Sequence, residues 1–167
     1  YAVEALGERI KREKLNLVAV PTSYQAFLLA VKCGITVTTL DEHPLIDVAI
    51  DGADQIDPKL NLIKGMGAAL AREKIVASAS KLEVLSFAIT TVKRRIEAVG
   101  GKAVLREGKG KLGPVITDNG NAIIDASFGP IGNAAELEKK LKMIPGVVET
   151  GLFVNLADIA YVGTHSA

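Results

Sequence analysis

Short apolar runs alternate with amphipathic stretches in the first third of the chain, and this alternation constrains the fold most strongly. We predict strands at residues 17–20, 35–39 and 47–50, with helices at residues 1–14 and 21–33. Strands that are apolar throughout and alternate with helices are typical of a parallel sheet that helices cover on both faces. The first third therefore predicts an α/β fold.

The second half of the chain has a different pattern. We predict helices at residues 87–99 and 134–143, and strands at residues 104–106 and 147–154. Between them, Asn119-Gly120 separates two β-branched runs, which predicts a hairpin turn whose two central residues both have positive φ. The predicted fold class is thus α/β, with a Rossmann-like parallel sheet and a smaller α+β (ferredoxin-like) module.

Composition excludes several classes of function. The chain has 167 residues, and its 20 Lys and Arg nearly balance its 19 Asp and Glu, so no basic excess is available to bind a nucleic-acid backbone. Trp is absent and Phe and Tyr are few, so a base-stacking platform is not expected. The longest uncharged run, residues 15–31, is too polar and too interrupted for a membrane span. We expect neither a nucleic-acid nor a membrane partner.

Cysteine usage indicates a reducing compartment. The single cysteine, Cys33, excludes an internal disulfide framework, and no signal peptide opens the chain. We therefore expect a cytoplasmic protein.

The densest group of candidate functional residues is the segment from Asp51 to Asp57, Asp-Gly-Ala-Asp-Gln-Ile-Asp, directly after a predicted strand. Ligands of open parallel sheets bind beyond the carboxyl ends of the strands, and carboxylates there can transfer protons or bind hydroxyls. Asp and Gly are also common in ordinary turns, so this segment alone leaves both interpretations open. It has no His or Cys nearby and lacks the spacing of a calcium loop, which makes a metal site the weaker hypothesis.

Lys64-Gly65-Met66-Gly67 precedes a predicted helix that is rich in Ala and Leu. Backbone amides at a helix start can bind an anion, and Lys64 would add a full positive charge. A glycine connection with a solvated lysine would have the same sequence, so this motif is weak by itself.

Glu73 lies on the apolar face of that predicted helix. Its neighbours at helical spacing are Ala69, Leu70, Val76 and Ala77. Burial would raise the pKa of this carboxyl toward the range of a general base. A buried structural pair with Lys64 or Arg9 is an equally open interpretation.

Four basic residues in the second half form a patch that we interpret as a solvated face or a subunit contact. They are Lys102, Arg106, Lys109 and Lys111.

Taken together, these segments resemble type A ribose-5-phosphate isomerases. The resemblance is carried by residues 51–57 and 62–74, and it continues through residues 113–121, 144–153 and 157–164. It runs over nearly the whole chain in order. Several long motifs that agree in this way are more specific than any single glycine pattern.

The resemblance implies an aldose–ketose isomerase that interconverts ribose 5-phosphate and ribulose 5-phosphate in the pentose phosphate pathway. It implies a cis-enediolate intermediate, Glu73 as the catalytic base, Asp51 as a carrier of the hydroxyl proton, and Lys64 as the stabilising charge, with no metal or other cofactor. The substrate-binding residues that it implies are Asp51, Gly52, Ala53, Asp54, Lys64, Gly65, Met66, Gly67 and Lys81.

The resemblance also implies a domain division and self-association. The expected catalytic domain comprises residues 1–85 and 157–167, and the small domain comprises residues 86–156. The family's members are dimers or tetramers, so we expect a homodimer or homotetramer.

Two departures from the family pattern accompany the resemblance. Residues 1–8 resemble the helix that follows the family's phosphate loop, so that loop is absent from the chain as given. Residues 73–85 are shorter than the family pattern, which has an extra strand and a Pro-containing link there. This short stretch contains Lys81, which we match to a later lysine of the family.

Two alternatives belong to other classes of function. A sugar-phosphate-sensing domain could keep the pocket without the base, although the joint presence of Glu73, Asp51 and Lys64 weighs against it. A coenzyme A transferase-like enzyme would need an exposed nucleophilic Glu after a strand, whereas Glu73 lies within a predicted helix.

Overall fold

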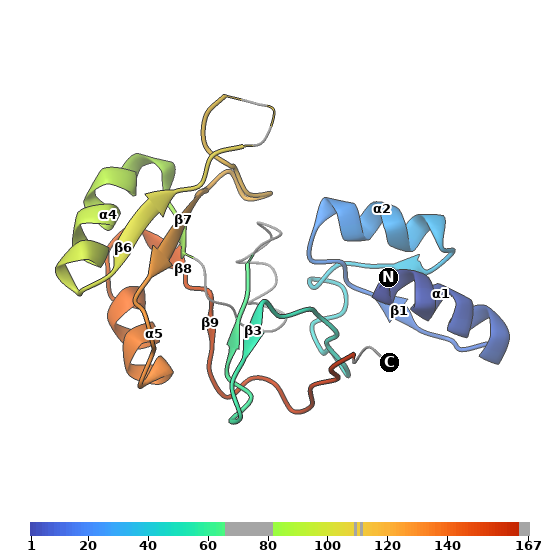
Figure 1. Ribbon diagram of the computed structural model, residues 1–167. Helices are drawn as coiled ribbons and strands as arrows, with labels where there is room; N and C mark the ends of the chain where they lie inside the picture. Colours follow the sequence, from blue (N-terminus) through green and yellow to red (C-terminus); the bar gives the residue numbers. More distant parts are fainter. Residues whose placement is uncertain (66–81, 109, 111, 164–167) are drawn as a thin grey trace. The chain divides into compact units, whose positions relative to one another are not determined.

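The computed structural model describes residues 1–65, 82–108, 110 and 112–163 (Figure 1). The chain divides into two compact units, Tyr1–Asp51 and Gly52–Ala167.

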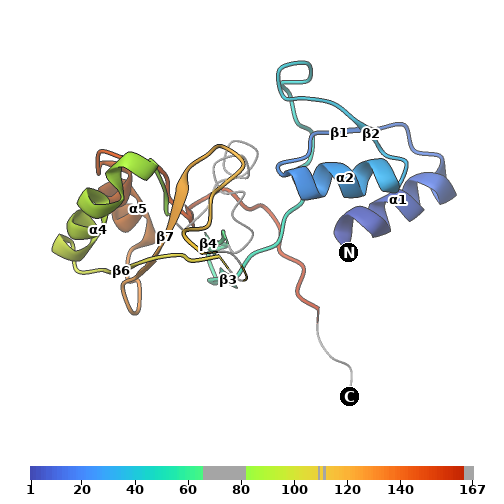
Figure 2. The same ribbon diagram turned by 90° about the horizontal axis from the view of Figure 1, so that it is seen from above.

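The first unit contains two helices and one pair of parallel strands. They are α1 (Ala2–Glu13), β1 (Val18–Ala19), α2 (Tyr24–Lys32) and β2 (Thr36–Val37). The strands pair in parallel with Val18 opposite Thr36, and both helices lie on the same side of them (Figure 2). These elements confirm the first four predicted segments.

Local chemistry explains the position of α2. The Ser23 hydroxyl oxygen accepts a hydrogen bond from the Ala26 N–H at 3.1 Å, which caps the start of the helix. Helix α1 approaches α2 closely where Gly7 meets Cys33, because a Cβ on Gly7 would lie 2.7 Å from the Cys33 Cβ.

The predicted strand at residues 47–50 is wrong. This segment belongs to none of the sheets in the described part of the chain, and Val48 and Ile50 are 72% and 70% exposed. An apolar run becomes a strand only where a neighbouring strand pairs with its backbone N–H and C=O groups. The described residues provide no such neighbour here.

The second unit contains a four-stranded antiparallel sheet with two helices. The elements are β5 (Leu82–Val84), α4 (Ile89–Ala98, after a 3₁₀ turn at Ser86–Ala88), β6 (Lys102–Leu105), β7 (Ala122–Ser127), α5 (Ala134–Lys142) and β8 (Val147–Glu149). The strand order is β6-β7-β5-β8. A β-α-β-β-α-β chain with this order is ferredoxin-like, so the predicted α+β module is confirmed.

The core of the second unit lies between this sheet and its helices. Val92 and Ile96 of α4 are fully buried and belong to one apolar cluster with Ile124 of β7 and Leu141 of α5. Because strand side chains alternate between the two faces, Asp125 lies on the face opposite to this core.

A second, three-stranded sheet is also antiparallel. It consists of β3 (Gln55–Ile56), β4 (Leu62–Ile63) and β9 (Leu152–Phe153), in the order β3-β4-β9. The predicted strand at residues 147–154 is therefore divided between two sheets. In the described part of the chain only β1 and β2 pair in parallel, so a wider parallel sheet stays a prediction.

The predicted hairpin at Asn119-Gly120 forms with a different turn. Only Gly120 has positive φ, at 79°, and its N–H donates to the Thr117 carbonyl at 2.9 Å. The Thr117 N–H donates to the Asn121 carbonyl at 2.8 Å, which makes a three-residue loop with a left-handed glycine at its end. The expectation of two positive φ angles is wrong because the loop is one residue longer.

Candidate active site

The acidic segment runs into the β3–β4 hairpin, and its last carboxylate closes that hairpin. Asp57 accepts hydrogen bonds from the backbone N–H groups of Lys59 (2.8 Å) and Asn61 (2.9 Å) and from the Asn61 side-chain amide (2.8 Å). The Asn61 amide is the main cause that lowers the pKa of Asp57. Asp57 therefore has the turn role that was one open interpretation, which leaves Asp51 and Asp54 as the candidate functional carboxylates.

Lys64 is a buried cation at the end of β4. Its side chain donates a hydrogen bond to the Gly52 carbonyl, and its Nζ lies 5.3 Å from the centroid of the Phe153 ring. The residue is 4% exposed. A buried ammonium needs such partners, because its desolvation is costly without them. The structure thus places this positive charge against the acidic segment.

Of the other described candidates, Asp54 borders the strand that leads to Lys64. The Asp54 N–H donates to the Ile63 carbonyl at 2.8 Å, so the backbone of Asp54 borders the strand that carries Lys64. Asp51 ends the first unit and is bonded directly to Gly52. The candidates Met66, Gly67, Glu73 and Lys81 lie outside the described residues.

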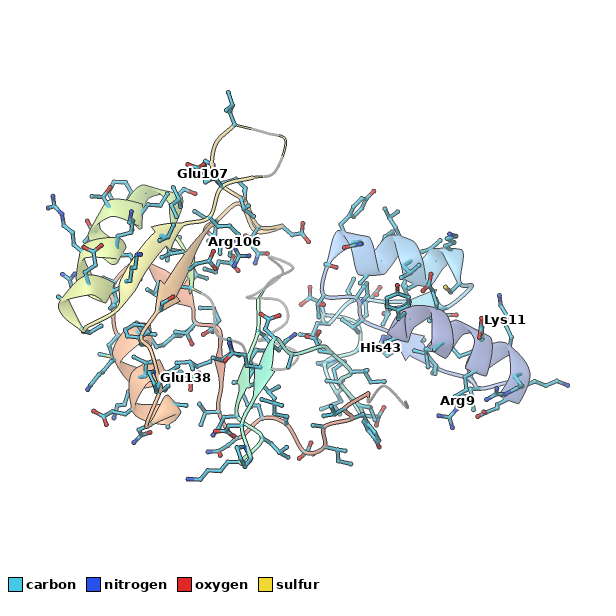
Figure 3. All side chains as sticks on the ribbon, viewed as in Figure 1. Arg9, Lys11, His43, Arg106, Glu107 and Glu138 are labelled. Carbon is cyan, nitrogen blue, oxygen red and sulfur yellow. The ribbon has the colours of Figure 1, made fainter. Side chains whose placement is uncertain are left out.

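Arg106 is not part of a solvated basic patch, contrary to our interpretation of the sequence. Its side chain is 17% exposed, and its Nε donates to Asp125 Oδ2 at 3.0 Å while Nη2 bonds Oδ1. A third donor, Nη1, reaches the Gly65 carbonyl at 3.0 Å. Figure 3 shows Arg106 just beyond the end of β6, on the side of the sheet away from α4.

Sequence reasoning missed this pair, although one signal was present. Asp125 is the one charged residue in the strand Ala-Ile-Ile-Asp-Ala-Ser. A charge within an otherwise apolar strand needs a partner, but the sequence alone does not say which cation lies opposite.

Sequence reasoning also missed a second polar cluster, on the face of the four-stranded sheet that points away from its helices. Glu83 of β5 is fully buried and accepts hydrogen bonds from the Thr117 hydroxyl (2.9 Å) and from the side-chain amides of Asn121 (2.7 Å) and Asn119 (3.3 Å). The carboxylate therefore ties the 117–121 turn to the middle of the sheet.

Described residues of the second unit line two pockets that bear on the site. The larger, of about 390 Å³, is lined by Gln55, Asp125, Thr150 and neighbouring apolar residues, and the smaller, of about 240 Å³, shares Gln55. Lys64 and Asp54 line neither cavity. The candidate polar site therefore does not coincide with either one.

The described part of the chain shows neither a cluster of metal ligands nor a membrane-spanning helix. No three His, Cys, Asp or Glu side chains among these residues lie close enough together to hold a metal ion. No helix among them has both the length and the apolar character that crossing a membrane requires.

Comparison with known proteins gives one consistent result. The family model described as ribose 5-phosphate isomerase A (phosphoriboisomerase A) matches residues 18–82 and 81–167. A ribose-5-phosphate isomerase A of Synechocystis sp. is 47% identical over 186 aligned positions, which cover 98% of this chain and 79% of the relative. A counterpart from Methanothermobacter thermautotrophicus is 46% identical over 98% of this chain and 81% of that protein.

Solved structures agree with the sequence matches. A D-ribose-5-phosphate isomerase in complex with phospho-erythronic acid superposes with a TM-score of 0.88 at 43% identity, covering 93% of this chain and 78% of that one. The fold and the sequence are thus those of an aldose–ketose isomerase. The chain belongs to the ribose-5-phosphate isomerase A family. Neither the sugar-sensing domain nor the coenzyme A transferase-like enzyme is favoured by these matches.

The matches also bear on the shortened stretch at residues 73–85. The two parts of the family match meet at residues 81–82, inside that stretch. The 186 positions aligned with the Synechocystis protein exceed the 167 residues of this chain by 19. The relative therefore has residues with no counterpart here, as the sequence pattern indicates.

Proposed function

We propose that this chain interconverts ribose 5-phosphate and ribulose 5-phosphate through a cis-enediolate, with Glu73 as the general base. The observation that carries the proposal is the buried Lys64 ammonium against Gly52, in a chain that matches the isomerase family over nearly its whole length. We infer the substrate from the activity for which the family is named.

The reaction needs one proton moved between carbons and one between oxygens. Glu73 takes the proton from C2 of the aldose and returns it to C1, while the hydroxyl proton leaves O2 and a proton reaches O1. Asp51 carries this hydroxyl proton. A single carboxylate serves for both carbon steps, because the proton that it removes is the proton that it returns.

Lys64 stabilises the charge that develops in the intermediate. The enediolate oxygens become negative in the transition state, and a fixed positive charge in a desolvated place stabilises them more strongly than bulk water does. The carbonyl of Gly52 and the ring of Phe153 hold the ammonium before substrate arrives. Lys64 can therefore act without a metal ion.

The proposed substrate-binding set rests on the motifs of this chain that resemble the family. We propose that Asp51, Gly52, Ala53 and Asp54 bind the sugar hydroxyls. The backbone of residues 65–67 completes the pocket, and Lys81 is a further substrate-binding residue. A relative of known structure is in complex with phospho-erythronic acid, which is a phosphorylated sugar acid. We expect this chain to bind the same compound.

The proposed architecture has two domains in a self-associating chain. The sequence-based division assigns residues 1–85 and 157–167 to a catalytic domain with a Rossmann-like parallel sheet and residues 86–156 to the small domain. Strand β5 (Leu82–Val84) pairs with β7 and β8, so we assign it to the small domain as well. The active form is a homodimer or homotetramer. Light scattering of the purified chain measures that state directly.

The decisive test is an assay of the purified chain with ribose 5-phosphate in the presence of excess EDTA, followed by NMR of the ketose product. We expect ribulose 5-phosphate to accumulate to equilibrium. Binding of phospho-erythronic acid without any turnover would instead identify a sensor. Exchange of coenzyme A between acids, without isomerisation, would identify a transferase.

A further inference from the structure

Three side-chain and backbone contacts hold the chain where it leaves β4, and one of them comes from the α+β module. The Lys64 N–H donates to the Gly151 carbonyl at 3.3 Å, and the Lys64 side chain donates to the Gly52 carbonyl. The carbonyl of the following residue, Gly65, accepts a hydrogen bond from Arg106 Nη1 at 3.0 Å. Arg106 is 42 residues further along the chain than Lys64, so this contact is tertiary.

Arg106 binds the backbone at Gly65, a residue that has little conformational restraint of its own. Gly65 has φ of 105°, a conformation that glycine adopts readily and other residues rarely do. A glycine has the most backbone freedom to lose on folding, so a contact to the Gly65 carbonyl helps to hold the backbone next to Lys64 in one conformation. The guanidinium provides that contact.

Arg106 is itself fixed in place. Its backbone N–H donates to the Ile123 carbonyl at 2.9 Å, and its own carbonyl accepts from the Val115 N–H at 2.8 Å. Asp125 bonds the Nε and Nη2 edge of the guanidinium, which directs Nη1 at Gly65. A bidentate pair of this kind fixes orientation as well as charge.

We propose that Arg106, oriented by Asp125, is a positioning residue for the isomerisation: it holds the Gly65 carbonyl and thereby keeps the Lys64 ammonium at Gly52. This inference rests on the proposed function of Lys64. The α+β module thus contributes to the site through one arginine, which touches the backbone beside the catalytic lysine and does not touch the substrate.

The test compares Arg106→Met, Arg106→Lys and Asp125→Asn with the matched control Lys102→Met. Lys102 is an exposed cation on β6, the strand that ends next to Arg106, and it lies outside the proposed site. Circular dichroism and thermal unfolding establish that each variant folds. Steady-state kinetics then separate kcat from KM.

We expect Arg106→Met to lower kcat by about 10- to 100-fold with little change in KM, because a misplaced charge weakens transition-state stabilisation more than substrate binding. Arg106→Lys keeps the charge but cannot bond Asp125 and Gly65 together, so we expect a partial recovery. The kcat of Asp125→Asn should lie between those of Arg106→Met and Arg106→Lys, and the kcat of Lys102→Met should equal that of the wild type.

A second measurement reads the position of Lys64 without any turnover. Lysines are ¹³C-dimethylated, and Lys64→Arg identifies the Lys64 methyl signal. We expect this signal to move toward those of exposed lysines in Arg106→Met and to stay in place in Lys102→Met.

The outcomes separate the two proposals. An inactive wild type contradicts the proposed function, while the methyl signal still decides whether Arg106 positions Lys64. If Arg106→Met folds with lower thermal stability but unchanged kcat and an unchanged Lys64 signal, Arg106 is merely structural and the inference is wrong. If Arg106→Met does not fold, the same readouts on Asp125→Asn decide.

Discussion

The Lys64 side chain donates a hydrogen bond to the carbonyl oxygen of Gly52, 12 residues earlier in the chain. The β3–β4 hairpin brings these residues together, because it turns the chain back between Asp57 and Asn61. One tight turn thus places a cation against the acidic segment, and it does so within the second unit alone.

The first prediction concerns the charge of Lys64. Lys64→Met keeps an unbranched side chain beside Phe153 but removes the positive charge. We expect kcat/KM for ribose 5-phosphate to fall on the order of 10²- to 10³-fold, as when one oxyanion donor is removed from an enzyme. Turnover close to wild type in the folded variant would exclude Lys64 as the stabilising group. Lys64→Arg is the charge-preserving control.

The second prediction concerns Glu73, which lies outside the described residues. Glu73→Gln removes the base but keeps the size and shape of the side chain. We expect turnover to be almost abolished, while calorimetry shows nearly unchanged binding of phospho-erythronic acid. Near-normal rates would refute the base assignment. A loss of binding and turnover together would indicate a structural role for the carboxylate.

The third prediction concerns stability and the buried carboxylate of Glu83. Glu83→Leu leaves the Thr117 hydroxyl and the Asn121 amide without this acceptor in a buried place. We expect the free energy of unfolding to fall by about 1–3 kcal/mol, measured by urea denaturation of the second unit's transition.

Two companion variants qualify the Glu83 result. Glu83→Gln keeps one carbonyl acceptor and should be less harmful than Glu83→Leu. Glu97→Gln, on the exposed face of α4, should leave stability unchanged. Equal stability of Glu83→Leu and the wild type would show that the turn holds its place without the carboxylate.

The fourth prediction is a pH dependence that arises at Asp57. Hydrogen bonds from Asn61 lower the pKa of this carboxyl in the folded protein. The unfolded chain therefore binds more protons at acidic pH than the folded chain does. The contribution of Asp57 to stability is complete above its ordinary pKa and is lost as pH falls through the lowered one.

Asp57→Asn should accordingly flatten the acid side of the stability profile, with the difference from wild type vanishing at the lowest pH. Urea unfolding across the acidic range measures this. Asp158→Asn, an exposed carboxylate of the same unit, serves as the control. An unchanged profile in Asp57→Asn would assign the acid sensitivity to another group.

Whether an element was predicted correctly depended on whether its backbone hydrogen bonds lie within one segment of the chain. The helices α1 and α4 were predicted from their apolar spacing, and α2 and α5 from the residues at their ends. These signals are sufficient because a helix makes its hydrogen bonds within one segment. The strand at residues 47–50 was predicted wrongly, because its hydrogen bonds require a partner strand that its own residues do not specify.

Sequence alone determined the family motif of the candidate site and the α+β module, since both depend on residue types and spacing. Only the tertiary structure decided that Glu83 anchors the 117–121 turn and that Arg106 reaches Gly65. The reason is physical: a buried polar side chain must find its partners across strands that are distant in the chain, and strand order decides which groups meet.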